Sequence, residues 1–136
     1  MRLCVISNKE CWQDETGRWF SSGGFPLQMG AIGSLFDEMT LVIIGHRFCA
    51  GGLPLPSSAK VIPLGHLPNG LLRRRLEMVR WLPPNILTMA AAIRQADVVH
   101  IPMPGDIPFL AMQVALLMRK RLVARYGAAW NNCVNA

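Results

Sequence analysis

Charge is scarce in this sequence, and acidic charge most of all. Only 16% of the 136 residues are charged, where about a quarter is usual for a globular protein. Lys and Arg number 14 against 8 Asp and Glu, which gives a formal net charge of +6. With 51% hydrophobic residues the chain is too apolar to be disordered, and its length suits one domain. This composition predicts a large core, or a domain that a partner partly covers.

Cysteine and histidine are too scattered to predict a metal centre or a disulfide framework. The four cysteines, Cys4, Cys11, Cys49 and Cys133, form no C-x-x-C pair, and no histidine stands at zinc spacing near them. We therefore expect no metal site and no cofactor. The patterns of a nucleophile elbow, a catalytic triad or the paired carboxylates of glycoside hydrolysis are missing as well.

Long apolar runs are also missing. The longest covers residues 107–118, is interrupted by Pro108 and Gln113, and is too short to span a bilayer. The N-terminal run turns polar at Ser7, so a secretory signal is not expected. These absences predict a cytoplasmic protein, with peripheral contact at the inner face of the membrane left open.

What the chain does contain is an alternation of short apolar runs and helical patterns. We expect strands at 3–6, 40–44, 60–64, 98–101 and 122–124, and helices over 26–36, 69–82, 85–96 and 107–118. Pro83 and Pro84 are predicted to end a helix, and Asp106 to cap the last one. The alternation indicates parallel βαβ units. The predicted fold class is α/β, a Rossmann-like parallel sheet of about five strands with helices on both faces.

In such a sheet ligands bind beyond the carboxyl ends of the strands. There, Gly23 and Gly24 form the candidate anion cradle, because glycines let backbone N–H groups approach a phosphate at a helix start. The loop lacks the G-x-G-x-x-G spacing and a Walker lysine, so a plain turn before a helix is an equal interpretation. Arg125, at the end of the last strand, is placed to reach a phosphate or carboxylate, with a surface ion pair as the alternative.

Two residues at this edge are candidates for acid–base chemistry. His100 closes the fourth predicted strand; a histidine there is more often packed in the core, but an exposed one would transfer protons near neutral pH. Asp106 is more often a helix cap than a catalytic acid.

Basic residues gather in two stretches and suit anionic partners such as phosphates, nucleotides or acidic lipid. The first lies in the amphipathic segment 69–82 and contains Arg73, Arg74, Arg75 and Arg80. The second covers residues 119–125. A solvated helix face is the plain alternative for either stretch, and nucleic acid is not an expected partner.

The order of these pieces resembles the N-terminal domain of the family 4 retaining glycosyltransferases, which have the GT-B fold. The resembling segments are 1–7, Gly23-Gly24, 41–45, 96–107 and 121–127. The resemblance implies a nucleotide-sugar donor, a glycan or lipid-linked acceptor, and a cleft between two domains. In the family a glycine pair in this loop contacts the donor diphosphate or the acceptor. The basic segment 69–82 becomes a candidate for acceptor or membrane contact.

The sequence departs from that family in two respects. The family pattern H-x-H-x-P reads His100-Ile101-Pro102-Met103-Pro104 here, so Pro102 replaces the histidine that lies near the reaction centre. The C-terminal domain, which grips most of the nucleotide, does not follow Ala136. We therefore expect a truncated acceptor-side part, inactive without its second domain.

Two other functions stay open. One is a nucleotide- or dinucleotide-binding domain of an oxidoreductase, although residues 45–47 after the second predicted strand offer no acidic group for a ribose. The other is a non-catalytic membrane-associated module whose basic clusters bind acidic lipid.

Overall fold

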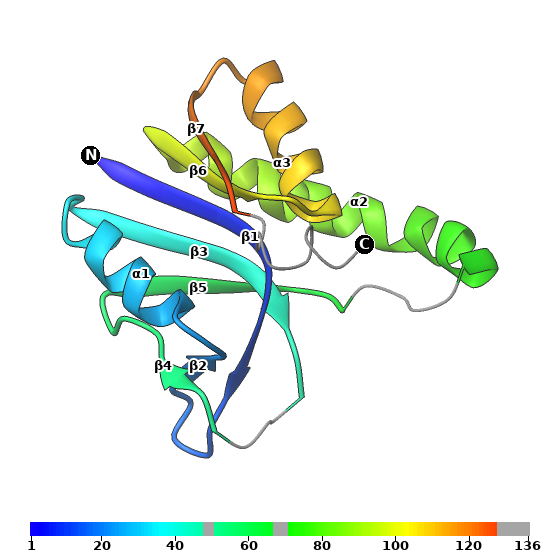
Figure 1. Ribbon diagram of the computed structural model, residues 1–136. Coiled ribbons are helices and arrows are strands. Elements are labelled where there is room, and N and C mark those ends of the chain that lie inside the picture. The colour runs from blue at the N-terminus through cyan, green and yellow to red at the C-terminus, as the bar shows by residue number, and fades with distance from the viewer. Residues whose placement is uncertain (48–50, 67–70, 128–136) are drawn as a thin grey trace, which may run out of the picture.

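The computed structural model describes residues 1–47, 51–66 and 71–127, the side chains of 71–75 excepted. These residues form one seven-stranded sheet and three helices (Figure 1). The strands are β1 Arg2–Gln13, β2 Trp19–Ser21, β3 Glu38–Gly45, β4 Leu53–Pro54, β5 Ala59–Leu64, β6 Val98–Met103 and β7 Arg121–Tyr126. The helices are α1 Phe25–Gly33, α2 Leu71–Gln95 and α3 Asp106–Leu117.

The sheet mixes parallel and antiparallel strands. β5, β3, β1, β6 and β7 pair in parallel in that order, whereas β2 pairs antiparallel with β1, and β4 with β2. The predicted Rossmann-like sheet of about five parallel strands is therefore wrong, because the sheet has seven strands and two antiparallel pairings. The inference of half a GT-B fold depended on that sheet and is withdrawn with it.

The error comes from residues 7–24, which we expected to be a loop. Ser7, Asn8 and Lys9 have the composition of a turn, but here they form a bulge at which the β1–β3 register shifts, and β1 then continues. Cys11 and Trp12 in the second half of β1 are buried. Their burial explains why this half stays in the sheet and folds back into β2 as a hairpin.

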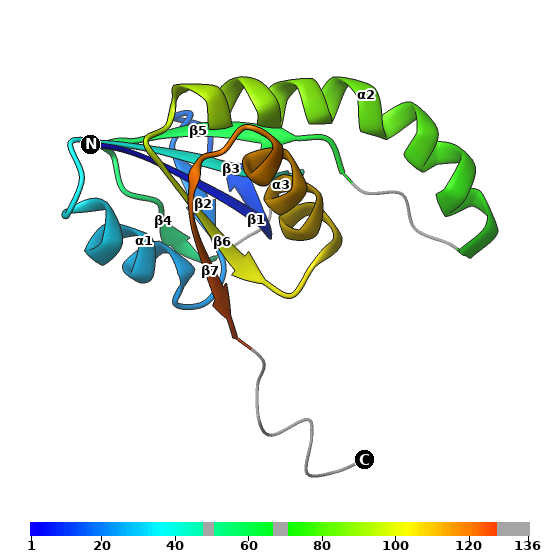
Figure 2. The ribbon, with the colours of Figure 1, turned by 90° about the horizontal axis from the view of Figure 1, so that it is seen from above.

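Two hydrophobic clusters fill the two faces of the sheet. On one face α1 contributes Met29, which packs against inward residues of β1 and β3: Leu3, Val5, Leu41 and Ile43. On the other face α2 and α3 cover the alternate residues of β1, β3 and β6: Cys4, Ile6, Val42, Ile44, Val99 and Ile101. This alternation follows from the two-residue period of a strand. Figure 2 shows the sheet lying between α1 and the α2–α3 pair.

Helix α2 continues through Pro83 and Pro84, which we predicted to end a helix. Each proline removes one backbone hydrogen bond from the helix. Tertiary contacts at this point oppose that cost: buried Trp81 donates its Nε1–H to the carbonyl of Gly65 at 2.8 Å, and the Asn85 Oδ1 accepts the N–H of Gly65 at 3.1 Å. The helix arcs over the sheet as a single element (Figure 2).

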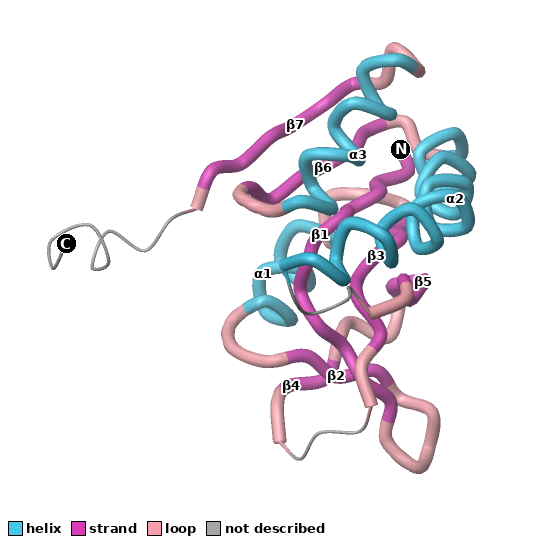
Figure 3. The backbone as a smooth tube through the Cα atoms, turned by 90° about the vertical axis from the view of Figure 1, so that its right-hand side faces the viewer, coloured by secondary structure: helices cyan, strands magenta, loops and turns pink. Residues whose placement is uncertain are grey.

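The carboxyl ends of the five parallel strands define one edge of the sheet, which we call the carboxyl edge. α3 begins there, directly after β6. β2 runs back along β1 and ends with Ser21 beside Cys11, so α1 also begins close to the β1 bulge. Figure 3 shows β2 and β4 extending the sheet past this point. Among the described residues, no helix combines the length and apolar character needed to cross a bilayer.

Candidate functional site

The β1 bulge lies at the centre of the carboxyl edge. The side chain of Ser7 is buried, and its Oγ accepts the N–H of Lys9 at 3.2 Å. Bulges re-aim side chains and are common beside functional sites. Here the bulge sends Lys9 towards the start of α1 and Asn8 towards the start of α3.

The start of α1 is open and positively charged. Its N-cap is Gly24, and no side chain caps the first turn by a hydrogen bond. A Cβ placed on Gly23 would lie 3.9 Å from the Nζ of Lys9, and one placed on Gly24 would meet nothing within 4 Å. Gly23 has a φ of 67°, a conformation that favours glycine. The predicted anion cradle is therefore an uncrowded helix start with an ammonium group beside it.

His100 lies in the middle of β6, not at its end as we predicted, and its side chain is on the face of the sheet that α1 covers. It pairs in register with Val5 of β1 and with Val123 of β7. Its side chain is 6% exposed, and its Nδ1 is buried without a hydrogen-bond partner among the described residues. Burial, and then the positive charge of Arg125, lower the pKa of His100. The imidazole is therefore held neutral.

Arg125 connects β7 to α1. Its Nη1–H donates to the Oε1 of Gln28 at 3.4 Å. Arg125 lies near the carboxyl end of β7, as we predicted, and its backbone pairs with Pro102 of β6. We call Lys9, Gly23, Gly24, His100 and Arg125 the helix-start site. It combines two cationic side chains, a bare helix N-terminus and a neutral imidazole, which together suit an anionic ligand carrying hydroxyl groups.

The start of α3 differs, because it is filled. We predicted Asp106 as the N-cap, but the N-cap is Gly105. Asp106 lies in the first turn of α3 and is exposed. A Cβ on Gly105 would lie 2.9 Å from Asn8 Nδ2 and 3.0 Å from Pro108 Cδ.

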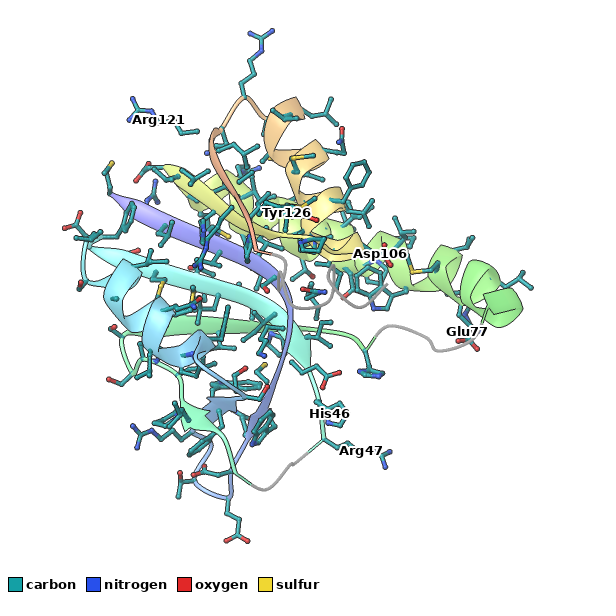
Figure 4. The ribbon with its side chains drawn as sticks, viewed as in Figure 1. His46, Arg47, Glu77, Asp106, Arg121 and Tyr126 are labelled. Carbon is teal, nitrogen blue, oxygen red and sulfur yellow. The ribbon has the colours of Figure 1, made fainter. Side chains whose placement is uncertain are left out.

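The structure separates the two acid–base candidates, His100 and Asp106. Asp106 lines a hollow between α2 and α3 together with Met78, Leu82, Phe109 and Leu110. Figure 4 shows Asp106 on this side of the sheet, whereas His100 lies on the face that α1 covers. The two side chains do not form one acid–base pair.

The basic segment of α2 is described only in part. The side chains of Arg73, Arg74 and Arg75 lie outside the described residues. Arg80 is exposed, and so are its neighbours Leu76, at 76%, and Val79, at 69%. These apolar side chains, which we predicted as one face of an amphipathic helix, are not covered by the domain.

A second group of polar residues lies at the carboxyl edge, on the other side of β1. One carboxylate oxygen of Glu10 and one ring nitrogen each of His46 and His66 all lie within 4.8 Å of one another, and all three residues are exposed. The two imidazole rings meet edge to face, with centroids 5.3 Å apart. We call Glu10, His46 and His66 the histidine cluster. Two imidazoles and one carboxylate form a set that binds divalent transition metals.

The histidine cluster was not predicted from the sequence, although the sequence places a histidine at the end of two neighbouring strands. His46 directly follows Gly45, the last residue of β3, and Gly65-His66 follows β5. These strands are parallel neighbours in which Ile44 pairs with Leu64, so continuing the register places the histidines side by side. Glu10 pairs with Ile44 from β1 only because of the bulge, which the sequence pattern did not predict.

The cysteines in the described residues offer no reactive group. Cys4 and Cys11 are free and buried, and burial raises the pKa of each thiol to about 12. A thiol that stays protonated is neither a nucleophile nor a metal ligand at neutral pH. Cys49 and Cys133 lie outside the described residues.

Comparison of the chain with protein-family models, with curated proteins and with solved structures gives no match. The resemblance to the family 4 retaining glycosyltransferases therefore stays a prediction from the sequence. The chemistry of the helix-start site is the remaining guide to function.

Proposed function

We propose that the helix-start site binds a sugar or nucleotide ligand through its phosphate, and that the chain is the acceptor-side part of a glycosyltransferase. The observation that supports phosphate binding is the uncapped start of α1 at Gly24, with the ammonium group of Lys9 beside it. A helix N-terminus presents unpaired N–H groups and partial positive charge, and an ammonium ion adds to that field. Arg125 supplies a second cation, in a geometry that can grip two phosphate oxygens.

The buried imidazole supports a ligand with hydroxyl groups. The Nδ1 of His100 has no partner among the described residues, and a buried nitrogen without a hydrogen bond is costly. A hydroxyl group of a bound sugar would provide that partner. His100 then acts as a hydrogen-bonding group that recognises the ligand, since burial keeps it neutral.

The assignment to a glycosyltransferase depends on the sequence resemblance and on this ligand chemistry. A nucleotide-sugar carries a diphosphate and several hydroxyl groups, which match the cations and the imidazole of the helix-start site. Under this proposal sugar transfer requires a second domain that grips the nucleotide, so the chain alone binds ligand without turnover.

Ligand titration tests the proposal. We expect the chain to bind a nucleotide-sugar such as a UDP-sugar in isothermal titration calorimetry, and to bind NAD(P) more weakly. Lys9→Ala and Arg125→Ala should each weaken binding by about tenfold or more, because each removes a charge-assisted hydrogen bond. Lys60→Ala and Arg18→Ala are matched controls, since both residues are exposed and lie outside the helix-start site.

Three outcomes count against the proposal. Saturation by NAD(P) but not by any nucleotide-sugar would favour the dinucleotide-binding alternative. An equal loss of affinity in the Lys60 and Arg18 controls would show that the ligand is held only by the overall positive charge of the chain. Measurable sugar transfer by the chain alone would contradict the need for a second domain.

One observation favours membrane contact as an additional role. Leu76 and Val79 are exposed on the first part of α2, next to Arg80, and an apolar strip flanked by basic residues suits an anionic bilayer surface. Vesicle sedimentation should show binding to anionic but not to neutral vesicles. Leu76→Ser combined with Val79→Ser should abolish binding that survives high salt, because salt screens only the electrostatic part.

A further inference from the structure

We propose that Glu10, His46 and His66 bind one divalent transition-metal ion at the carboxyl edge. The three residues come from three adjacent strands, and one ligand atom of each already lies within 4.8 Å of the other two. Two ligands of a tetrahedral site, each about 2.1 Å from the ion, lie roughly 3.4 Å apart. Exposed side chains reach that spacing by small rotations.

Hydrogen bonds hold the backbone at or next to each of the three metal-binding residues. The carbonyl of Glu10 accepts the hydroxyl of Ser21 at 2.7 Å, and the N–H of His46 donates to the carbonyl of Cys11 at 2.7 Å. Gly65, just before His66, is held by the side chains of Trp81 and Asn85 of α2. A ligand set with a fixed backbone loses less conformational entropy when the ion binds.

A hydrogen bond sets the tautomer of one of the two rings. The Nδ1 of His46 lies 2.9 Å from the carbonyl oxygen of Arg47. As a carbonyl only accepts, Nδ1 carries the proton and Nε2 is left with its lone pair for a metal. Metal-binding histidines commonly donate their other ring N–H to a carbonyl in this way. Figure 4 shows His46 at the end of β3, with the side chain of Arg47 extending away from the sheet.

The donor set decides the class of ion. Imidazole nitrogens favour zinc, iron, cobalt, nickel and copper over magnesium and calcium, which prefer oxygen ligands. Three protein ligands leave at least one position for water, because the cluster is exposed. The proposal is independent of the ligand bound at the helix-start site.

The test uses the untagged chain, stripped of metal with a chelator and kept reduced. We expect calorimetric titration with Zn²⁺ to show one equivalent bound, and an excess of Mg²⁺ to leave that binding unchanged. His46→Ala and His66→Ala should weaken binding by more than the roughly 10- to 100-fold that loss of an outer hydrogen-bond partner costs. Glu10→Gln should weaken it as well, and Glu15→Gln, an exposed carboxylate in the β1–β2 turn, should not.

Two spectroscopic signals identify the ligands directly. The chain has three histidines, so proton NMR should show Zn²⁺ shifting the ring signals of His46 and His66 while those of buried His100 stay in place. Co²⁺ should give a d–d spectrum without a thiolate charge-transfer band, which excludes the cysteines as ligands. The proposal is overturned by zinc binding that survives both histidine variants, by a thiolate band, or by no stoichiometric binding at all.

Discussion

The two sides of β1 carry the same residue type in opposite environments. Towards β6, His100 is 6% exposed and has an Nδ1 without a partner among the described residues. Towards β3 and β5, His46 and His66 are exposed, face each other and share a carboxylate neighbour. Burial holds the first histidine inside the domain, whereas the other two are open to solvent. The two helix starts differ in the same way, because that of α3 is filled and that of α1 is open. Three predictions test these contrasts.

The largest effect is expected at the filled helix start. Gly105→Ala should lower the free energy of unfolding by about 1–3 kcal/mol, because the new Cβ would lie 2.9 Å from Asn8 and 3.0 Å from Pro108, closer than van der Waals contact allows. Gly24→Ala is the matched control: it is also an N-cap glycine, yet nothing lies within 4 Å of its Cβ position, so its change should stay within about 0.5 kcal/mol. Urea unfolding of both variants measures the difference. Equal losses would show that the two helix starts are packed alike.

A medium effect is expected from the buried histidine. Burial lowers the pKa of His100 below its ordinary value of 6.5, so the unfolded chain binds the proton more readily than the native one. Stability should therefore fall as the pH drops from 6.5 through the lowered native pKa. His100→Leu should flatten that part of the profile, measured by urea unfolding from pH 8 to about 5.

Two carboxyl groups also make stability depend on pH, but in a lower pH range than His100. The pKa values of Asp14 and Asp97 are lowered, by the hydroxyl of Thr16 and by the backbone N–H of Arg2 respectively. Their stabilisation disappears only as the pH falls below 3.8, which is separate from the histidine range. If His100→Leu leaves the slope above pH 5 unchanged, His100 is not the group that titrates there.

The smallest effect is expected at the exposed pair. His46→Ala and His66→Ala should each change the free energy of unfolding by less than about 0.5 kcal/mol, since exposed side chains contribute little. With Zn²⁺ present, the native chain but neither variant should gain stability, because an ion that binds only the folded state stabilises it. Thermal unfolding with and without Zn²⁺ measures both quantities.

The apolar runs of the parallel strands were easier to predict than the segments that join them. The apolar runs at 40–44, 60–64, 98–101 and 122–124 do lie in β3, β5, β6 and β7, because short runs of consecutive apolar residues favour a strand. The sequence also placed Gly23 just before a helix and Arg125 near the end of a strand, where the structure has them, whereas His100 lies in the middle of β6 and not at its end. Local composition failed at residues 7–24 and at Pro83-Pro84, where contacts distant in sequence override local preference.

The amino-acid sequence alone determined the apolar segments of the five parallel strands, the basic character of the chain and the glycines that open α1. Only the tertiary structure decided that β1 continues past its bulge, that the sheet is mixed, and that Glu10 meets His46 and His66. The reason is physical: a strand's apolar pattern is local, whereas pairing partners, register and burial depend on which segments pack together. Three side chains 20 or more residues apart become neighbours only when parallel strands align their ends.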